Sequence, residues 1–289
     1  DPELAKGLAE RGNQLTGLAP AVLGHGGGVV ASERVQGARV LDSHDPKEVR
    51  RCLDWVANHL WASGKMQDAP PPSELMPATR RMYVEKTRER SRAMARRLPE
   101  LGTEARINGL YCPPVDDLLD TIDSDARGVL SAPVVAPFHG DLHAENVLVD
   151  ATDRLWLIDW RTDFGGLSAF GDITYDLAKM IHTLEFPTPV MTEHRFSVAR
   201  DDDGVLCIGH NGVAELEQSR QAFWSFVGDH GHDASRVLAV DALVFLSMSP
   251  LYDDRIGEYL YLLGQVLLSA AIQNDLEPES AFESLFGID

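Results

Sequence analysis

Two short apolar runs constrain the fold of this chain more than any other feature. Residues 147–149 and 155–158 flank the polar tetrapeptide Ala151-Thr152-Asp153-Arg154, which predicts two paired strands joined by a turn. Pairing brings the outer ends of the two strands together. Residues that precede the first strand therefore become neighbours of residues that follow the second.

Three polar side chains stand at that edge. Asp141 and Asn146 precede the first strand with the spacing D-x-x-x-x-N, and Asp159 follows the second. A carboxylate can take a proton from a hydroxyl group, and an amide oxygen with a second carboxylate can bind a hard cation. Phosphoryl transfer from a magnesium nucleotide requires this set of groups. The edge of the hairpin is therefore the candidate active site.

Three motifs in this order resemble the aminoglycoside phosphotransferase and choline kinase-like family, a branch of the protein-kinase-like fold. They are HGDLHAENVLVD (139–150), LIDW (157–160) and GDITYDLAK (171–179). The resemblance implies an α+β fold in two parts. Residues 1–41 would be the remainder of a nucleotide-binding N-terminal lobe, a helix plus a β-hairpin. Residues 42–289 would be a large, mostly helical lobe for catalysis and substrate binding.

The same resemblance implies a role for the polar residues of the first two motifs. Asp141 would be the catalytic base, and Asn146 and Asp159 would be the Mg²⁺ ligands. His139 would support the catalytic loop by hydrogen bonding.

The sequence Asp163-Phe164-Gly165 also spells the DFG motif of protein kinases and offers Asp163 as the metal ligand instead. We prefer Asp159, because it ends a predicted strand. Asp163 lies in what reads as a loop with Gly165-Gly166.

A predicted helix that begins near residue 171 carries two further acids. Asp172 or Asp176 would serve as a simple helix cap. The resemblance adds that one of the two braces the catalytic loop, and we assign that structural role to Asp176.

The N-terminal stretch predicts a helix over residues 1–15 and a β-hairpin over residues 20–35. The glycine-rich run His25-Gly26-Gly27-Gly28 between them reads as the hairpin turn. It also spells an oxyanion-hole motif of esterases, but no G-x-S-x-G sequence follows it.

In the resembled fold, the connector at residues 33–37 follows this hairpin, and the backbone of Glu33 and Val35 would pair with adenine. A phosphate loop and a strand with a phosphate-binding Lys do not precede it, and Lys6 lies on the predicted helix. We expect either that this chain is a piece of a longer protein or that its small lobe is degenerate.

The net charge of −19 is unevenly distributed. Residues 1–137 carry 18 Lys and Arg against 19 Asp and Glu, and residues 138–289 carry 8 against 26. Such an acidic second half argues against nucleic acid as a partner. It would steer a cationic substrate toward the protein, although a solvated acidic surface is the simpler interpretation.

The three cysteines, Cys52, Cys112 and Cys207, lie far apart without metal or disulfide spacing, which predicts a cytoplasmic protein. No apolar run approaches the roughly 20 residues of a membrane span, and no signal peptide opens the chain. We therefore expect no membrane partner.

Helical spacing predicts further helices after the connector, and an Asp-rich turn predicts one more hairpin. The expected helices cover residues 45–63, 77–98, 115–130, 213–228, 234–246 and 256–272, and the hairpin covers 193–208. The helix at 77–98 is rich in Arg, which indicates either a solvated face or a grip on an acidic partner. In the resembled family the C-terminal segments select the acceptor. The resemblance therefore suggests four residues of the acceptor pocket, Tyr252, Asp253, Asp254 and Glu258.

Two metal motifs carry less weight. His139 and His143 flank Asp141 as H-x-D-x-H, but no further His or Cys is spaced to complete a zinc site. The run 201–203 is a D-x-D motif, but Asp-rich turns before Gly are common.

These patterns together predict an Mg²⁺-dependent kinase that moves the γ-phosphoryl group of ATP or GTP to a hydroxyl group of an aminoglycoside, amino alcohol or sugar. The prediction of activity assumes that the missing N-terminal elements exist upstream. Two other classes stay open. One is a nucleotide-binding regulatory module without transfer activity, and the other is a protein Ser/Thr kinase, although Gly140 replaces the Arg of the H-R-D loop.

Overall fold

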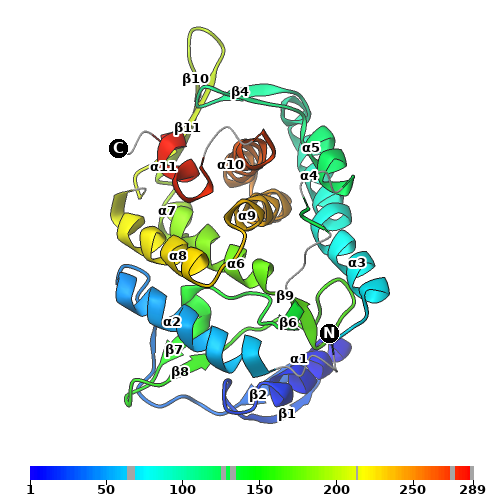
Figure 1. Ribbon diagram of the computed structural model, residues 1–289, viewed down its shortest axis with the longest axis vertical. Coiled ribbons are helices and arrows are strands. Elements are labelled where there is room, and N and C mark those ends of the chain that lie inside the picture. Colours follow the sequence, from blue (N-terminus) through cyan, green and yellow to red (C-terminus); the bar gives the residue numbers. More distant parts are fainter. Residues whose placement is uncertain (64–68, 125–127, 131–134, 213, 274–276, 287–289) are drawn as a thin grey trace.

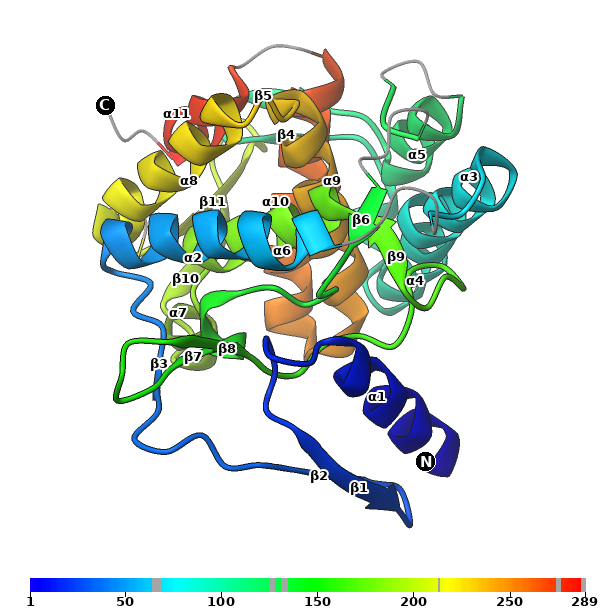
Figure 2. The same ribbon diagram turned by 60° about the horizontal axis from the view of Figure 1, so that its bottom comes forward.

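A helix and a β-hairpin at the N-terminus lie beneath a larger, mostly helical part (Figures 1 and 2). The computed structural model describes residues 1–63, 69–124, 128–130, 135–212, 214–273 and 277–286. A small N-terminal β region followed by a mostly helical remainder confirms the predicted α+β class. The division at residue 41 stays a prediction.

The helices in chain order are α1 (Pro2–Gln14), α2 (Pro46–His59), α3 (Pro72–Arg80), α4 (Lys86–Arg97), α5 (Val115–Asp123), α6 (Ile173–Glu185), α7 (Thr188–Thr192), α8 (Glu217–Asp229), α9 (Ala234–Met248), α10 (Asp254–Gln273) and α11 (Ala281–Phe286). The strands are β1 (Val22–Gly26), β2 (Val29–Ser32), β3 (Arg39–Val40), β4 (Ala105–Ile107), β5 (Leu110–Cys112), β6 (Val135–Pro137), β7 (Val147–Val149), β8 (Leu155–Leu157), β9 (Phe170–Asp172), β10 (Phe196–Arg200) and β11 (Leu206–His210).

The N-terminal helix and hairpin form as predicted. The carboxylate of Asp1 caps α1 by accepting a hydrogen bond from the backbone N–H of Glu3. Strands β1 and β2 pair antiparallel, and the turn between them uses Gly27 and Gly28 at φ values of 58° and 83°, a region that favours glycine. The glycine-rich run is therefore a hairpin turn.

The buried face of α1 is formed by small residues and one arginine. Leu4 is 52% exposed, whereas Ala5, Ala9 and Arg11 are buried. The Arg11 guanidinium donates to the backbone oxygen of Phe138. The helix therefore turns its small residues and one cation toward the segment that precedes the catalytic motif.

The central hairpin forms as predicted. Leu148 of β7 lies opposite Trp156 of β8 in an antiparallel ladder. Strand β3 adds to the other edge of β7, with Val40 opposite Leu148. This short strand was not predicted, and it brings the connector that follows β2 beside the hairpin (Figure 2).

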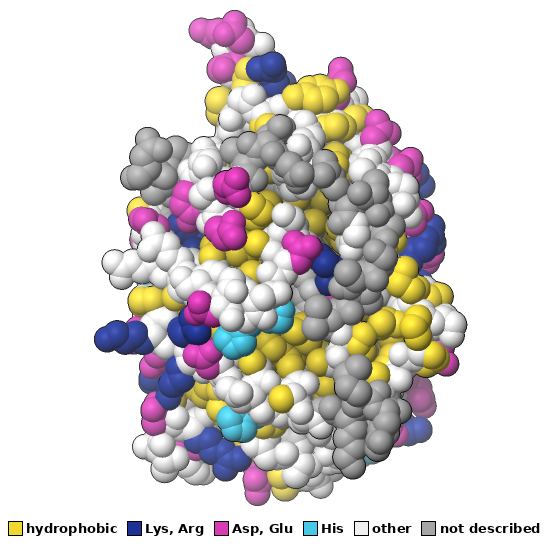
Figure 3. Space-filling view, viewed as in Figure 1, with side chains coloured by type: hydrophobic (Ala, Val, Ile, Leu, Met, Phe, Trp, Pro, Cys, Tyr) yellow, Lys and Arg dark blue, Asp and Glu magenta, His cyan; other side chains and the backbone are white. Residues whose placement is uncertain are grey.

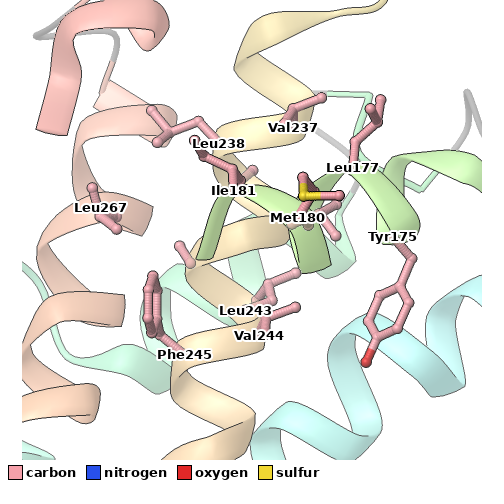
Figure 4. Packing of buried hydrophobic residues seen from close by; sticks show 14 of the residues in the cluster. Tyr175, Leu177, Met180, Ile181, Val237, Leu238, Leu243, Val244, Phe245 and Leu267 are labelled. Carbon is pink, nitrogen blue, oxygen red and sulfur yellow. The ribbon is translucent and has the colours of Figure 1, made fainter. Parts of the chain in front are cut away.

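The hydrophobic core lies among α6, α9 and α10. Figure 4 shows Ile181 of α6, Leu238 and Phe245 of α9, and Leu267 of α10 packed against one another, and all four are buried. Helix α9 is apolar around most of its circumference because it has neighbours on several sides. The core fixes α6, which carries the third sequence motif, against the rest of the large part.

One buried helix qualifies the prediction that no apolar run approaches a membrane span. Among the described residues, the window Ala234–Leu251 is long and apolar enough by length and composition. However, 72% of that window is buried inside the fold. A core helix passes the same test, so this window is weak evidence for a membrane span.

The Arg-rich helix begins earlier than predicted and has an internal irregularity. It starts at Pro72 as α3, passes through a π-helical segment at Arg81–Glu85 and continues as α4. Arg88 and Arg92 of α4 pair with Asp120 and Asp116 of α5. The basic helix thus forms ion pairs with an acidic helix of the same chain.

One other boundary and one hairpin also differ from the sequence prediction. Helix α5 ends at Asp123, not at residue 130. The hairpin of β4 and β5 was not predicted, and it joins β10 and β11 in one four-stranded sheet. Acidic side chains project from the tip of the β10–β11 hairpin, where residues 201–203 form the expected turn (Figure 3).

Candidate active site

Asp141 and Asn146 lie in contact at the entrance to β7. The Asn146 side-chain amide donates a hydrogen bond to the backbone oxygen of Asp141 at 2.9 Å and lies 3.4 Å from its carboxylate oxygen Oδ2. The backbone N–H of Ile158 donates to the backbone oxygen of Asn146 at 3.0 Å. The end of β8 is thereby fastened to the loop that carries both side chains.

Asp159 follows directly on this edge. Its φ of 57° lies in the left-handed region, which is uncommon for a residue with a side chain and is found at functional sites. Asp159 is exposed. Its charge and that of Asp141 both raise the pKa of His143, which burial lowers overall. The two carboxylates therefore act on the same small region.

Asp163 is engaged elsewhere. Its carboxylate oxygen Oδ2 accepts a hydrogen bond from the backbone N–H of Gly166 at 2.7 Å. The backbone N–H groups of Phe164 and Leu167 each donate to the other residue's oxygen, at 2.8 and 3.0 Å. The carboxylate of Asp163 thus closes a tight turn, as Asp residues commonly do.

His139 and Asp176 hold the loop at residues 139–146, the predicted catalytic loop. The Nε2 atom of His139 lies 2.9 Å from the backbone oxygen of Ile158. The carboxylate of Asp176 accepts hydrogen bonds from the backbone N–H groups of His139 and Gly140, at 2.9 and 2.7 Å, and from the indole N–H of Trp61 at 3.1 Å. Burial raises the pKa of Asp176 to about 6, although these hydrogen bonds each lower it.

Asp172 has a different environment, so the two acids divide the roles that the sequence left open. Asp172 caps α6 by accepting from the backbone N–H of Thr174 at 3.1 Å. It also pairs with the buried guanidinium of Arg236 and accepts from the hydroxyl of Tyr83 at 2.8 Å. Asp172 thus ties three helices together.

Gly140 is a position where no side chain fits. Its φ is 84°, and a Cβ atom there would lie 2.7 Å from Cβ of Arg161 and 2.9 Å from the ring of Phe138. An Arg at this position, as in the protein-kinase H-R-D loop, would require this packing to change.

Lys179 is a site residue that the sequence did not reveal. Its ammonium group lies 2.8 Å from Oδ1 of Asp141 and 3.5 Å from Nε2 of His182. Its side chain is only 8% exposed. Burial alone would raise the pKa of Asp141, but the charge and hydrogen bond of Lys179 lower it to about 2. The carboxylate of Asp141 is therefore ionised at neutral pH.

Two cavities meet at Asp141 and Lys179. One has a volume of about 170 Å³ and lies among α4, α6 and α9. The other has a volume of about 260 Å³ and includes His143, Glu145 and His182. Tyr252 lines both cavities, so an acceptor near Asp141 would contact it from either side.

The other acceptor-pocket predictions fall elsewhere. Asp253 accepts a hydrogen bond from the backbone N–H of Ile256, and Asp254 pairs with Arg97. Neither lines a cavity beside Asp141 in the described part of the chain, and the same holds for Glu258.

The connector residues lie at a third cavity, with a volume of about 240 Å³. Glu33 and Val35 line it together with Asp150, Thr152 and Trp156 of the central hairpin. The indole N–H of Trp156 donates to Asp150 at 2.9 Å. A flat aromatic side chain beside exposed backbone is a suitable surface for a planar base.

The oxygen atoms available at the hairpin edge fit a hard cation. The amide nitrogen of Asn146 is occupied, and no donor to its Oδ1 is found in the described residues. Asp159 likewise forms no ion pair in the described ranges. Among those residues, no group of three or more His, Cys, Asp or Glu side chains is arranged to hold a metal ion, which disfavours the zinc interpretation of His139 and His143.

Comparison with known proteins gave one family and several structures. A family model described as "Phosphotransferase enzyme family" matches residues 6–204. The choline kinase LicA from Streptococcus pneumoniae is 16% identical, with 86% of this chain and 81% of that chain covered and a TM-score of 0.43. A glucosamine kinase is 17% identical, with 89% and 67% covered and a TM-score of 0.46. LicA in complex with AMP is 17% identical, with 86% and 80% covered and a TM-score of 0.36. A comparison with curated proteins found no match.

Proposed function

This chain belongs to the phosphotransferase enzyme family, and we propose that it transfers the γ-phosphoryl group of ATP or GTP to a hydroxyl group of a small molecule. The family match covers the central hairpin, the catalytic loop and α6. The observation that carries the proposal is the contact between Asp141 and Asn146 at an edge held by His139 and Asp176.

Asp141 is the proposed catalytic base. The acceptor oxygen forms a bond to the γ-phosphorus as the bond from phosphorus to the β–γ bridging oxygen breaks, and a nucleoside diphosphate leaves. The hydroxyl proton passes to the carboxylate of Asp141, which is ionised because the pKa lies near 2. Such transfer depends mainly on positioning and on charge stabilisation.

Asn146 and Asp159 are the proposed ligands of Mg²⁺. Their free amide and carboxylate oxygens are the donor types that Mg²⁺ prefers. When bound, the ion supplies positive charge to the phosphate oxygens. The strand pairing that joins Asn146 to Ile158 keeps the two ligands on one rigid edge.

The connector is the proposed site of the nucleotide base. Glu33 and Val35 offer backbone groups beside Trp156 in the cavity between connector and hairpin. This proposal assumes that further N-terminal elements complete the phosphate site.

The acceptor is proposed to be an aminoglycoside, an amino alcohol or a sugar. The choline and glucosamine kinases found by structural comparison act, by their names, on two of these classes. Nucleic acid and membranes are not among the proposed partners, and a cytoplasmic location stays a prediction that a tagged chain in cells would check.

The test compares the wild type with Asp141→Asn. ATP or GTP is supplied with Mg²⁺ and a panel of hydroxyl acceptors, and a generic protein substrate is included. We expect small-molecule phosphorylation that falls at least about 1,000-fold in the variant, since base and positioning are both lost, while nucleotide affinity stays within a few-fold. Asp201→Asn, in the remote β10–β11 turn, is the control.

Two results would contradict the proposal. Nucleotide binding without transfer to any acceptor would favour a regulatory module. Phosphorylation of the protein substrate alone would favour a protein kinase.

A further inference from the structure

The cavity of about 170 Å³ beside Asp141 is strongly basic. Four cationic side chains line it, Lys86 and Arg90 from α4, Arg161 from the segment after β8, and Lys179 from α6, and the one acid in its lining is Asp141. This composition is unexpected in a chain with a net charge of −19.

Three of these cations form no ion pair in the described part of the chain. Among the described residues, only Lys179 forms an ion pair, with Asp141. Arg90 donates to the backbone oxygen of Ser247 at 3.1 Å, and Lys86 Nζ lies 3.7 Å from the sulfur of Met82 and also interacts with Tyr175. Among the described residues no carboxylate forms an ion pair with these three cations, although Asp141, Asp159 and Asp163 act on Arg161 from a greater distance.

Arg161 is the most telling of the three. Its Nε atom is buried and has no hydrogen-bond partner within the described ranges. A buried guanidinium donor left unpaired is costly for the fold. Such a group indicates a missing acceptor, and a ligand can supply one.

The cations also surround one aromatic side chain. Lys86 Nζ and the Arg161 guanidinium carbon lie 5.6 and 5.9 Å from the ring centre of Tyr175, which points from α6 toward α4 (Figure 4). Burial would raise the pKa of Tyr175, but Arg161, Lys86 and Lys179 together lower it. Burial lowers the pKa of Lys86, and the charges of Arg161 and Arg90 lower it further. The positive potential in this cavity is therefore concentrated.

We propose that this cavity binds an anionic group, a phosphate or a carboxylate, carried by the acceptor whose hydroxyl is phosphorylated at Asp141. That the bound anion belongs to the acceptor rests on the proposed function. Guanidinium and ammonium groups pair with such oxyanions by charge-assisted hydrogen bonds. The anion would accept a hydrogen bond from the unpaired Nε–H of Arg161 and would balance the charges of Lys86 and Arg90.

The nucleotide phosphates are a less suitable occupant. The cavity at Glu33, Val35 and Trp156 shares no lining residue with the basic cavity. The connector and the central hairpin line the first of these cavities. Helices α4, α6 and α9 line the basic cavity. A donor nucleotide and an anionic acceptor would then approach Asp141 from different sides.

A cationic acceptor would have to use the neighbouring cavity of about 260 Å³. There Glu145 joins Asp141, and Lys179 is the one Lys or Arg in its lining. The basic cavity therefore favours an anionic acceptor, and the neighbouring cavity favours a cationic one.

The test measures direct binding, which does not require transfer. Glycerol 3-phosphate, glycerol, choline and inorganic phosphate are titrated calorimetrically into the wild type at fixed ionic strength. We expect glycerol 3-phosphate to bind at least about tenfold more tightly than glycerol or choline, because charge-assisted hydrogen bonds add to the hydroxyl contacts. Detectable binding of inorganic phosphate alone supports an oxyanion site.

The variants Lys86→Gln and Arg161→Gln are each expected to weaken glycerol 3-phosphate binding about tenfold. Arg92→Gln is the matched control, because Arg92 lies on the same helix, is 54% exposed and pairs with Asp116 away from the cavity. Lys86 is half-buried at the start of α4, so Lys86→Gln tests the site even where Arg161→Gln fails to fold.

Three outcomes would overturn the inference. They are equal binding of the charged and neutral probes, tighter binding of choline, and an equal loss of ATP affinity in Lys86→Gln, which would assign the cavity to the donor. Phosphorylation of choline with no anion binding would reject the inference and keep the proposed function. Anion binding that Lys86→Gln weakens, without transfer to any acceptor, would support the anion site and reject the proposed function.

Discussion

The ammonium group of Lys179 lies 2.8 Å from Oδ1 of Asp141, at the point where two cavities meet. Lys179 also approaches His182, and burial with the charge of Lys179 lowers the pKa of His182 well below its usual value. His182 is therefore neutral near pH 7, and the charge of Lys179 acts mainly on Asp141.

The first prediction concerns this ion pair. Lys179→Met should lower kcat about 10- to 100-fold, because the carboxylate of Asp141 loses the cation that orients it. Lys179→Arg should retain more activity, since it keeps a positive charge. The measurement is kcat at saturating acceptor with the nucleotide Kd determined separately. A Lys179→Met enzyme with the wild-type kcat would show that the ion pair does not position the base.

The second prediction separates the two candidate metal carboxylates. Asp159→Asn should raise the Mg²⁺ concentration needed for half-maximal rate by about tenfold or more, because a charged oxygen ligand is lost. Asp163→Asn should stay within about threefold of wild type, since Asp163 serves the turn at Gly166. The measurement is the rate as a function of Mg²⁺ at fixed nucleotide. The reverse pattern would transfer the metal role to Asp163.

The sequence was sufficient for features that depend on local pattern. The hairpin of β7 and β8 follows from two apolar runs around a polar turn, and its edge brings Asp141 and Asn146 into contact. The family resemblance is confirmed by the match over residues 6–204. The roles of the individual site residues stay predictions.

One missed element had a local signal. Asn108 and Gly109 separate β4 from β5, both with positive φ values of 47° and 87°. Asn-Gly between apolar runs is a strong hairpin signal. The two strands are only three residues long, which is too short for an alternation of apolar and polar residues to predict a strand.

The charge environment of the site required the tertiary structure. Lys86 and Arg90 come from the less acidic first half of the chain, and Arg161 and Lys179 from the acidic second half. The net charge of each half of the chain therefore could not predict a basic cavity whose cations come from both halves. Lys179 falls outside the apolar stripe of α6 that contains Leu177 and Met180, where a solvated lysine is ordinary, so its role left no sign in the sequence.

The third prediction separates two neighbouring acids of α6. Asp176→Asn should lower kcat about tenfold or more, because an amide cannot accept from both backbone N–H groups of the catalytic loop. Its free energy of unfolding should fall by about 1–3 kcal/mol. Asp172→Asn should cost about 3–5 kcal/mol, since it leaves the buried guanidinium of Arg236 without its carboxylate.

The measurements for these two variants are urea unfolding and kcat, both made at a temperature where each variant is folded. Asp172→Asn should keep a nearly normal kcat under those conditions. An Asp176→Asn enzyme with full kcat would mean that Asp176 stabilises the fold without positioning the loop.

The last prediction concerns pH and a buried pair of acids in the core. Glu185 of α6 and Asp241 of α9 are both fully buried. Burial raises the pKa of Glu185 from 4.5 to about 7, against the hydrogen bond with Asp241 and the charge of Arg220. Burial and the charge of Glu185 also raise the pKa of Asp241. The pair therefore holds at least one proton near neutral pH.

Because its pKa is higher in the folded than in the unfolded chain, Glu185 favours folding at low pH. Its contribution should decline as the pH rises from about 4.5 to about 7, by on the order of 2–3 kcal/mol. His139, which is buried, and His210, which is half-buried, have pKa values lowered to about 4 and change stability in the opposite direction over part of this range. The wild-type curve alone therefore mixes the two effects.

Glu185→Gln isolates the acid. The difference in free energy of unfolding between wild type and Glu185→Gln should shift against the wild type as the pH rises through this window and should level off above it. Glu279→Gln, which removes an exposed carboxylate, should show no such slope. A pH-independent difference for Glu185→Gln would mean that the pKa of Glu185 is the same in the folded and the unfolded chain, with the effect of burial offset by Arg220.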